Sequence, residues 1–253
     1  PGRMSTSEPS VQNIPKSIKP KFYSPSLTIV KADYPAIESR LAAVYTGETG
    51  LIEAFNAGED IHILTASKVM NKPKEEVQKK ERQLAKALNY GLLYGVGAGT
   101  FAASANADYG LELTVEQAAE FREKFFDAYP ALREWHHGTA RALRQGRGMV
   151  GRTLFGRVIR QNEEDYTDAL NSPIQGSGAD LLKLAVVQVW NDLKKFDGRA
   201  RILNLVHDEI VLAVYDPTIK AQVAVLLRDA MEGAAKKLMP EVRTPVEVDI
   251  VDA

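Results

Sequence analysis

The chain has 253 residues, of which 45% are hydrophobic and 26% charged, and its formal net charge at pH 7 is −1. This composition excludes a chain disordered throughout, a collagen-like chain and a histone-like polycation. The absence of cysteine excludes disulfides, thiolate nucleophiles and Cys-ligated metal centres, and fits a reduced cytosolic setting. No apolar run reaches the ~18–20 residues that span a bilayer, and no charged segment followed by an apolar one is found, so we expect no secretory signal. Because the chain begins with Pro1, we expect it to be a piece of a longer protein.

The first half of the chain reads as one strand followed by helices. Residues 1–25 are rich in Ser, Pro and Asn, which is typical of extended or looped chain. A β-branched run at 27–30 predicts a strand that leads to Asp33, and helices are predicted at 37–45, 51–55, 61–70 and 74–94. Asp60 is the expected cap of the third helix, and a capping box from Thr114 to Gln117 predicts another helix, to about residue 128.

The second half ends in strands. Pro130 begins a helix that ends near residue 146, and 165–184 is also helical, with Pro173 and two glycines marking a break or a close approach. Apolar runs at 202–206 and 210–214 predict a β-hairpin, followed by a helix at 218–238 and a strand at 246–251. Strands near both ends of a helical middle predict an α+β fold, with a small, largely antiparallel sheet and a helical insertion.

Charge is distributed in blocks. Residues 3–31 hold five bases and one acid, residues 141–160 hold six arginines and no acid, and residues 208–253 hold nine acids and five bases. Such blocks suggest a path for a polyanion on one face and a cation-binding pocket elsewhere, solvated helix faces being the simpler alternative.

Asp33 and Asp208 both stand at predicted strand ends. Carboxylates on adjacent strands can share a pair of hard cations such as Mg²⁺, and two such ions ~3.5–4 Å apart would clamp the oxygens of a phosphoryl transfer. The alternative is that Asp208 is only a turn residue.

Four side chains recur at every fourth position of the helix predicted at 74–94, which places them along one face. They are Arg82, Lys86, Tyr90 and Tyr94. An Arg and a Lys one turn apart can clamp phosphates, and a Tyr offers a stacking surface for a base or sugar. The alternative is an amphipathic helix whose tyrosines pack in the core. The glycines follow the helix and lack the spacing of a Walker A or Rossmann loop.

These motifs together resemble one family. The segment 82–95 resembles the nucleotide-binding O helix of family A DNA polymerases (RxxxKxxN[FY]GxxYG), 33–40 resembles the family's motif A, and 206–209 matches its motif C, VHDE. Residues 2–5 with 12–15 resemble its template–primer-contacting segment, and 153–157 and 171–176 also have counterparts. The order and spacing hold across nearly the whole chain, which is therefore identified as a member of family A, covering palm and fingers.

The resemblance implies an α+β fold in which an antiparallel palm sheet is backed by helices and interrupted by a helical fingers subdomain. The palm would comprise 1–59, with the template–primer segment and motif A, and 159–253, with the motif C hairpin; the fingers would be 60–158. Nothing resembles the thumb, the 3′–5′ exonuclease or the 5′ nuclease, so we expect no proofreading by this chain and a longer protein that supplies these domains. The implied setting is the cytoplasm, bacterial or phage-like, with an organelle as the alternative.

The function that the resemblance implies is template-directed addition of deoxynucleotides to a primer 3′ end, by phosphoryl transfer with two Mg²⁺ ions or with Mn²⁺ as a substitute. Its partners would be a DNA template–primer duplex and dNTPs, with no membrane. Asp33, Asp208 and the Tyr34 carbonyl would hold the metals, Lys86 would also be the acid for the leaving group, and Glu209 would lie beside the metals.

The remaining roles also follow from the resemblance. Glu38, His62, Arg82, Lys86 and Tyr90 would bind the dNTP, with Glu38 filling the space that a ribose 2′-OH needs. Template and primer would be contacted by Arg3, Gln12, Asn13, Arg40, Tyr94, Arg157, Gln175 and His207. For Glu209 a solvated hairpin acid, and for His62 an ordinary helix histidine, are the alternatives. His136 and His137 match no motif and are expected on the surface.

Four positions depart from the family pattern and bear on primer affinity and fidelity. Pro35 and Ala36 replace the usual Ser-Gln, Thr167 stands where many members have an Arg, and Tyr90 is less common there than Phe. Two other functions are weighed: a non-catalytic template–primer binding fragment that lacks its thumb, and a single-subunit RNA polymerase. Glu38 and the Tyr94-Gly95 pair argue against the latter.

Overall fold

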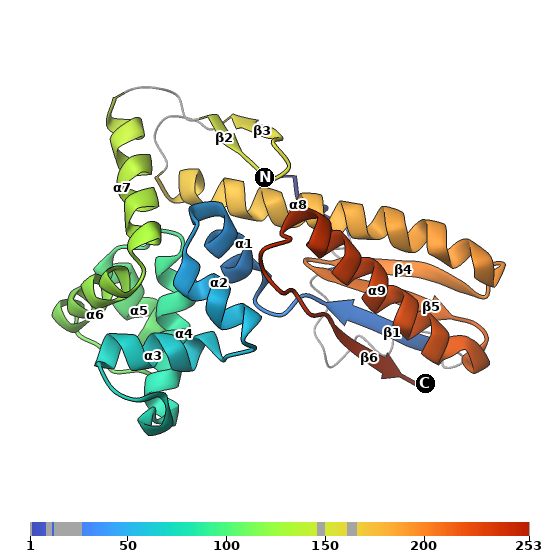
Figure 1. The fold of residues 1–253 in the computed structure, drawn as a ribbon, viewed down its shortest axis with the longest axis horizontal. Coiled ribbons are helices and arrows are strands. Elements are labelled where there is room, and N and C mark those ends of the chain that lie inside the picture. Colours follow the sequence, from blue (N-terminus) through green and yellow to red (C-terminus); the bar gives the residue numbers. More distant parts are fainter. Residues whose placement is uncertain (1, 9–11, 13–26, 146–149, 161–165, 253) are drawn as a thin grey trace. The chain divides into compact units, whose positions relative to one another are not determined.

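The structure is a computed structural model that describes residues 2–8, 12, 27–145, 150–160 and 166–252 (Figure 1). The chain forms two compact units. The sheet unit contains residues 1–37 and 175–253, and the helical unit contains residues 38–174. The palm and fingers boundaries that we expect at 59/60 and 158/159 follow the family's nomenclature and stay predictions.

The sheet unit is built on four antiparallel strands in the order β4-β5-β1-β6. The strands are β1 (Thr28–Asp33), β4 (Ala200–Val206), β5 (Glu209–Val214) and β6 (Glu247–Val251). The register pairs Val30 with Leu212 of β5, and both side chains are fully buried. The predicted antiparallel sheet, with strands from both ends of the chain, is confirmed.

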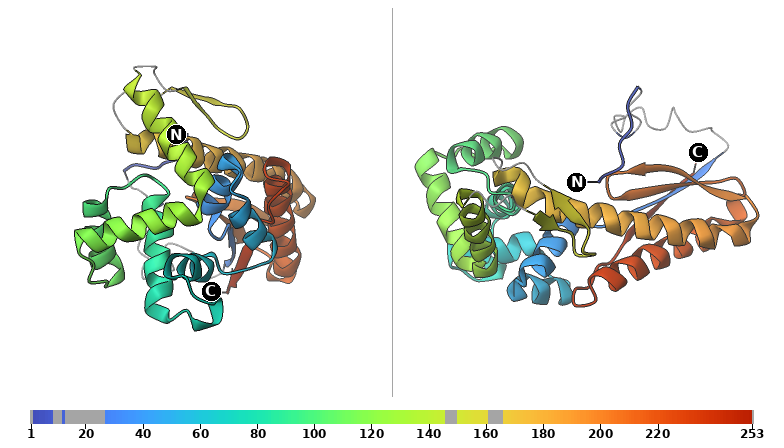
Figure 2. Two further views of the ribbon diagram at one scale, coloured as in Figure 1. Left: turned by 60° about the vertical axis from the view of Figure 1, so that its left-hand side comes forward. Right: turned by 90° about the horizontal axis from the view of Figure 1, so that it is seen from above.

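Helix α9 (Lys220–Leu238) covers one face of this sheet, together with the part of α8 (Tyr166–Leu193) from residue 175 onward (Figures 1 and 2). Buried Leu227 and Met231 lie on α9, and the Tyr34 hydroxyl donates a 2.8 Å hydrogen bond to the Met231 carbonyl. Tyr34 follows β1 directly, so this bond ties the end of the central strand to the covering helix.

The helical unit consists mainly of helices. They are α1 (Ile37–Thr46), which begins at the unit boundary, α2 (Thr49–Asn56), α3 (Ile61–Met70), α4 (Lys79–Leu92), α5 (Ala98–Tyr109), α6 (Val115–Ala128) and α7 (Pro130–Arg144). A two-stranded ribbon of β2 (Val150–Arg152) and β3 (Val158–Arg160) follows, and α8 begins in this unit. In the described part of the chain, no helix has both the length and the apolar character needed to cross a membrane.

Local side-chain chemistry determines several helix ends as predicted. The Asp60 carboxylate accepts hydrogen bonds from the amides of His62 and Ile63 and so caps α3. Thr114 and Gln117 form the predicted capping box of α6. Pro130 is the first residue of α7, where its missing amide hydrogen costs no helical bond.

Other predicted elements were wrong in extent. The helix predicted at 74–94 is split into a 3₁₀ turn at Lys74–Glu76 and α4, because Gln78 and Glu81 form a capping box that begins a new helix. Helix α8 has no break at Pro173 and continues to Leu193. Helix α5 and the β2–β3 ribbon were not predicted.

The Tyr34–Met231 bond predicts a stability effect. Tyr34→Phe keeps the buried ring and the backbone carbonyl but leaves the Met231 carbonyl without this donor, which should lower the free energy of unfolding by about 1–2 kcal/mol. Urea denaturation followed by circular dichroism measures the change. Tyr215→Phe, at a side chain that is 53% exposed, is the matched control and should change it by less than about 0.5 kcal/mol. Equal stabilities of the Tyr34→Phe and parent proteins would contradict this role.

Candidate functional site

The sheet register brings three acidic residues of the sheet unit to one end of the sheet. Asp33 is the last residue of β1, and Ala32 before it pairs with Ile210 of β5, so the next position along β5 is Glu209. Val206 pairs with Glu209, which leaves His207 and Asp208 as the two-residue turn between β4 and β5. Asp33, Asp208 and Glu209 therefore lie at the same end of adjacent strands.

His207 has the backbone geometry that such a tight turn requires. Its φ is +56°, in the left-handed region, where His is more common than most residues. Two-residue hairpin loops need a positive φ because only such turns match the twist of the flanking strands. The turn thereby fixes the position of Asp208, the residue that follows His207.

Glu209 has a basic partner on the neighbouring strand. The Lys31 ammonium lies 2.9 Å from a carboxylate oxygen of Asp249 and 3.6 Å from one of Glu209. The hydrogen bond to Asp249 is the largest reason why the pKa of Lys31 is raised, although partial burial opposes the shift and Glu209 adds to it. The ion pair with Lys31 thus keeps the Glu209 side chain close to the sheet. The sequence did not predict this ion pair.

The donor set at this sheet end suits a hard cation. Asp33 and Asp208 offer carboxylate oxygens, the ligands that Mg²⁺ prefers, and Mg²⁺ keeps several water ligands. No group of three His, Asp or Glu side chains in the described ranges is placed to hold a metal by itself. Two carboxylates with backbone, water and substrate oxygens are therefore the coordination that these residues fit.

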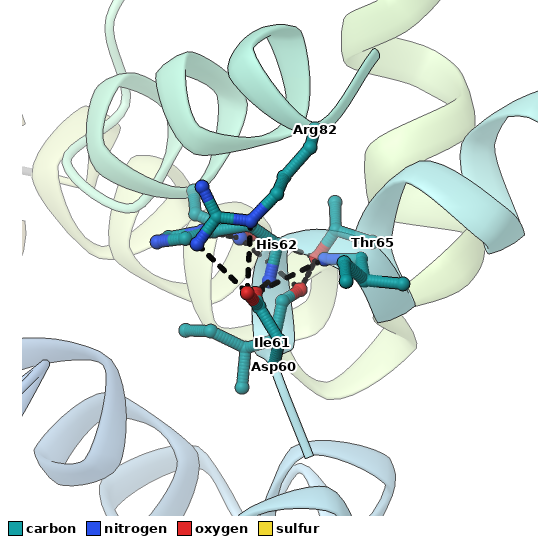
Figure 3. Close-up of polar contacts among 7 residues, drawn as sticks. Asp60, Ile61, His62, Thr65 and Arg82 are labelled. Carbon is teal, nitrogen blue, oxygen red and sulfur yellow. Dashed lines mark hydrogen bonds and ion pairs between the residues drawn. The ribbon is translucent and has the colours of Figure 1, made fainter. Parts of the chain in front are cut away.

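In the helical unit, Arg82 of α4 is held against the beginning of α3 (Figure 3). Its Nη2 and Nε atoms lie 2.7 and 2.8 Å from Oδ2 of Asp60, while Oδ1 of Asp60 caps α3. Partial burial favours the neutral acid, but the Arg82 guanidinium and the two capped amides outweigh it and lower the pKa of Asp60. Asp60 thus fixes the guanidinium, whose side chain remains 42% exposed and can reach an anion.

His62 is a neutral side chain beside this ion pair. It is 9% exposed, and burial, aided by Arg82 and Lys86 and opposed by Asp60, lowers its pKa to about 4. The side-chain amide nitrogen of Asn89 lies 2.9 Å from Nδ1. Because that nitrogen is a donor, Nδ1 accepts and the ring proton is on Nε2. The His62 ring centroid lies 5.8 Å from that of Tyr90.

Asn89 belongs to a buried polar network that holds α3 and α4 together. Its Oδ1 accepts from the Thr65 hydroxyl at 3.0 Å, and Thr65 also lies 2.7 Å from the Tyr129 hydroxyl. Burial, only partly offset by the Thr65 bond, raises the pKa of Tyr129 to about 12. The network therefore fixes His62 in the first turn of α3, beside the Asp60–Arg82 ion pair and the Tyr90 ring.

The other predicted residues fall into two sets. The sheet unit contains Arg3, Gln12 and Gln175. The side-chain amide of Gln12 donates to the carbonyls of Leu205 and Met4. In the helical unit are Glu38 on α1, Tyr94 just beyond α4, Arg157 in the β2–β3 turn and Arg40, which is buried with its guanidinium 4.1 Å above the Phe55 ring. Asn13 lies outside the described residues. The predicted roles of all these residues stay predictions.

The expectation that His136 lies on the surface was wrong. His136 is only 3% exposed, whereas the adjacent His137 is exposed as expected. His136 shares a helix face with buried Leu132 and Thr139, and their i, i+4, i+7 spacing was the signal that could have placed it in the core.

The chain is similar to known proteins along its whole length. The family model for DNA polymerase family A matches residues 1–252. DNA polymerase I of Aquifex aeolicus (strain VF5) is 42% identical over 251 residues, which are 99% of this chain and 43% of that protein. The thermostable DNA polymerase I of Thermus aquaticus is 36% identical over 270 residues, which cover 100% of this chain and 31% of that protein.

A solved structure agrees in fold. The POL domain of Pol1 from M. smegmatis, in a complex with DNA primer-template and dNTP, matches with a TM-score of 0.81 and 32% identity, over 100% of this chain and 46% of that chain. The chain thus spans less than half the length of these relatives.

The dual contact of Asp60 predicts different results for two substitutions. Asp60→Asn keeps an oxygen that can cap α3 and should change the free energy of unfolding by less than about 0.5 kcal/mol, whereas Asp60→Ala should lower it by about 1 kcal/mol. Both variants lose the charge that holds Arg82. Thermal unfolding of parent and variants measures the difference, and equal losses in the two variants would contradict the capping role.

Two buried neutral histidines predict a pH dependence of stability. Burial is the main cause that lowers the pKa of both His62 and His136 to about 4. For His62, Asp60 opposes this shift, whereas Arg82 and Lys86 add to it. For His136, the hydrogen bond to the Leu93 carbonyl opposes the shift, whereas Arg122 and His137 add to it. The unfolded chain binds these protons near the ordinary pKa of 6.5, so stability should be complete above about pH 6.5 and should fall toward pH 4. Each residue contributes up to about 3 kcal/mol to this fall.

Denaturant titrations of the parent and His62→Gln proteins at pH 7.5, 6, 5 and 4 test this dependence. The variant should show a smaller decrease in stability toward pH 4, because it lacks one group that gains a proton on unfolding. Parallel pH profiles for both proteins would contradict the assignment of a neutral His62.

Proposed function

Because the chain belongs to DNA polymerase family A, we propose that it has the activity of its relatives: template-directed addition of deoxynucleotides to the 3′ end of a DNA primer. The sheet register is the observation that carries this proposal, because it places Asp33 at the end of β1 beside the turn with Asp208. The M. smegmatis relative was solved with DNA primer-template and dNTP, which supports the same partners here.

The proposal includes two Mg²⁺ ions, for which Mn²⁺ would substitute, with Asp33, Asp208 and the Tyr34 carbonyl as their protein ligands. When bound, such ions favour ionisation of the primer 3′-hydroxyl and neutralise the charge of the departing pyrophosphate. Asp33 and Asp208 supply negative charge at fixed positions, since one ends a central strand and the other lies in a two-residue turn. Lys31, by pairing with Glu209, keeps that carboxylate directed along the sheet.

In the helical unit, the residues around the first turn of α3 would bind the triphosphate. Arg82 offers planar, paired donors, and Lys86 is a point charge that would also give a proton to the leaving pyrophosphate. Neutral His62 would donate from Nε2 to a phosphate oxygen. Asp60 holds the guanidinium in place beforehand, so less side-chain freedom is lost when the nucleotide binds.

The sugar and base would be selected by neighbouring side chains. Tyr90, which is 36% exposed, would stack on the incoming nucleotide, and Glu38 would exclude a ribose 2′-hydroxyl. We propose that Arg3, Gln12, Asn13, Arg40, Tyr94, Arg157, Gln175 and His207 contact template and primer. We assign no proofreading to these 253 residues.

A second candidate is a non-catalytic fragment that binds template–primer. The observation that favours it is the length of the chain, which covers 43% of the Aquifex aeolicus relative and 31% of the Thermus aquaticus relative. Both candidates require DNA binding, so they differ only in whether the chain extends a primer.

Primer extension by the parent protein separates the two candidates, and Asp208→Asn tests the metal assignment. This substitution should lower Mg²⁺-dependent primer extension at least about a thousandfold, because catalysis of this kind depends on fixed charge at the metal ions. Duplex affinity should stay within about twofold, since basic side chains on phosphates dominate it. Asp229→Asn, at an exposed acid of α9, is the matched control and should extend primers like the parent.

The assays are single-nucleotide extension of a labelled primer and fluorescence anisotropy of the same duplex. Extension by the Asp208→Asn protein near the parental rate would contradict the metal assignment. A parent protein that binds duplex but extends no primer would establish the non-catalytic candidate instead.

A further inference from the structure

His136 is a buried polar residue of the helical unit that the proposed mechanism does not use. Its ring lies among aromatic rings, with centroid distances of 4.9 Å to Phe126, 5.3 Å to Trp135 and 6.1 Å to Tyr166. An apolar side chain would fill such a space without the cost of burying two polar nitrogens. The buried imidazole is therefore expected to have hydrogen-bond partners for its two nitrogens.

Both ring nitrogens of His136 have partners. Nε2 lies 3.2 Å from the Leu93 carbonyl oxygen, and Nδ1 lies 3.1 Å from the Tyr166 hydroxyl. A carbonyl only accepts, so the proton is on Nε2. Burial, with Arg122 and His137 adding to it and the Leu93 bond opposing it, lowers the pKa of His136 to about 4, so the ring is neutral at pH 7. Nδ1 therefore accepts from the Tyr166 hydroxyl.

The carbonyl that His136 binds is at the end of α4. The last carbonyls of a helix have no partner within it, and Leu93 is the first residue after α4. Two residues later the chain turns at Gly95, whose φ is +74°. A β-carbon on Gly95 would lie 2.6 Å from Leu170 and 2.6 Å from the Tyr166 ring. The same Tyr166 thus binds His136 and packs against the turn.

We propose that His136, together with Tyr166, is a positioning residue that fixes the carboxyl end of α4 and thereby the base-binding end of the nucleotide site. This inference rests on the proposed function, in which Arg82, Lys86 and Tyr90 of α4 bind the dNTP. Tyr90 lies three residues before Leu93, within the last turn of α4. Arg82 lies eleven residues before Leu93, which corresponds to about 16 Å of helix. Losing the anchor should therefore disturb the base and sugar contacts of Tyr90 and leave the phosphate contacts of Arg82 intact.

Four variants of the full chain separate positioning from mere packing. His136→Phe keeps a ring in the core and removes both hydrogen bonds, and His136→Gln retains an amide that can donate to the Leu93 carbonyl. Tyr166→Phe removes only the hydroxyl and keeps the ring against Gly95. His137→Phe, at the exposed neighbour on the same helix, is the matched control.

The first measurement is equilibrium binding of dATP and of inorganic tripolyphosphate, which has no base or sugar, together with KM and kcat for primer extension. His136→Phe should weaken dATP binding and raise KM about tenfold, the factor that one net hydrogen bond commonly contributes. Tripolyphosphate binding should stay within about twofold, because the contacts of Arg82 and Lys86 are local. His136→Gln should recover most of the loss, Tyr166→Phe should show a smaller loss than His136→Phe, and His137→Phe should match the parent.

Hydrogen exchange provides a readout that needs no nucleotide. In His136→Phe, amides near Gly95 should exchange faster, while those of α3 should not change. Unchanged dATP binding, equal weakening of dATP and tripolyphosphate, or unchanged exchange near Gly95 would each overturn the inference. If His136→Phe does not fold, Tyr166→Phe decides by the same criteria. If the parent extends no primer, the proposed activity fails, while dATP binding and exchange still test the anchor.

Discussion

The antiparallel pairing of β1 between β5 and β6 is the constraint on which the sheet unit depends. β1 comes from the beginning of the chain and both partners from its last fifth, so the sheet forms only when the two ends meet. Because side chains alternate between faces, a register shift of one residue would turn Asp33 toward the face that α9 covers. The buried Tyr34 hydroxyl, bound to the Met231 carbonyl, opposes such a shift. The placement of the acids is thus a consequence of packing on the opposite face.

In the helical unit, a satisfied polar network has the corresponding role. Burying the side chains of His62, Thr65 and Asn89 is costly unless each finds a partner, and these residues are one another's partners between α3 and α4. Such a network is satisfied in only one alignment of the two helices. The Asp60 carboxylate accepts from the amide of His62 and pairs with the partly exposed Arg82. The packing of α3 against α4 therefore also restricts the side chain that we propose binds phosphate.

The elements that could be predicted are those determined by neighbouring residues. The strand before Asp33, the cap at Asp60 and the box at Thr114 each depend on side chains within four residues, and the structure confirms them. Helix α5 has mostly small residues, with only Phe101, Ala102 and Ala105 buried, so its helical period was weak. The local spacing could have placed His136 in the core, but its hydrogen-bond partners could not be predicted, because they are 43 and 30 residues away in the sequence. The pairing of Lys31 with Asp249 likewise depends on a register that no local pattern specifies.

The most direct test of the central claim maps the cation site on the chain itself. Fe²⁺ in place of Mg²⁺, with ascorbate and peroxide, cuts a backbone near the bound ion, and sequencing of the fragments locates the cuts. We expect two cuts, one close to Asp33 and one close to Asp208, both suppressed by excess Mg²⁺, because the register places these residues at one end of adjacent strands. Cleavage at only one of the two segments, or at neither, would contradict the claim that the β1 register builds a shared cation site.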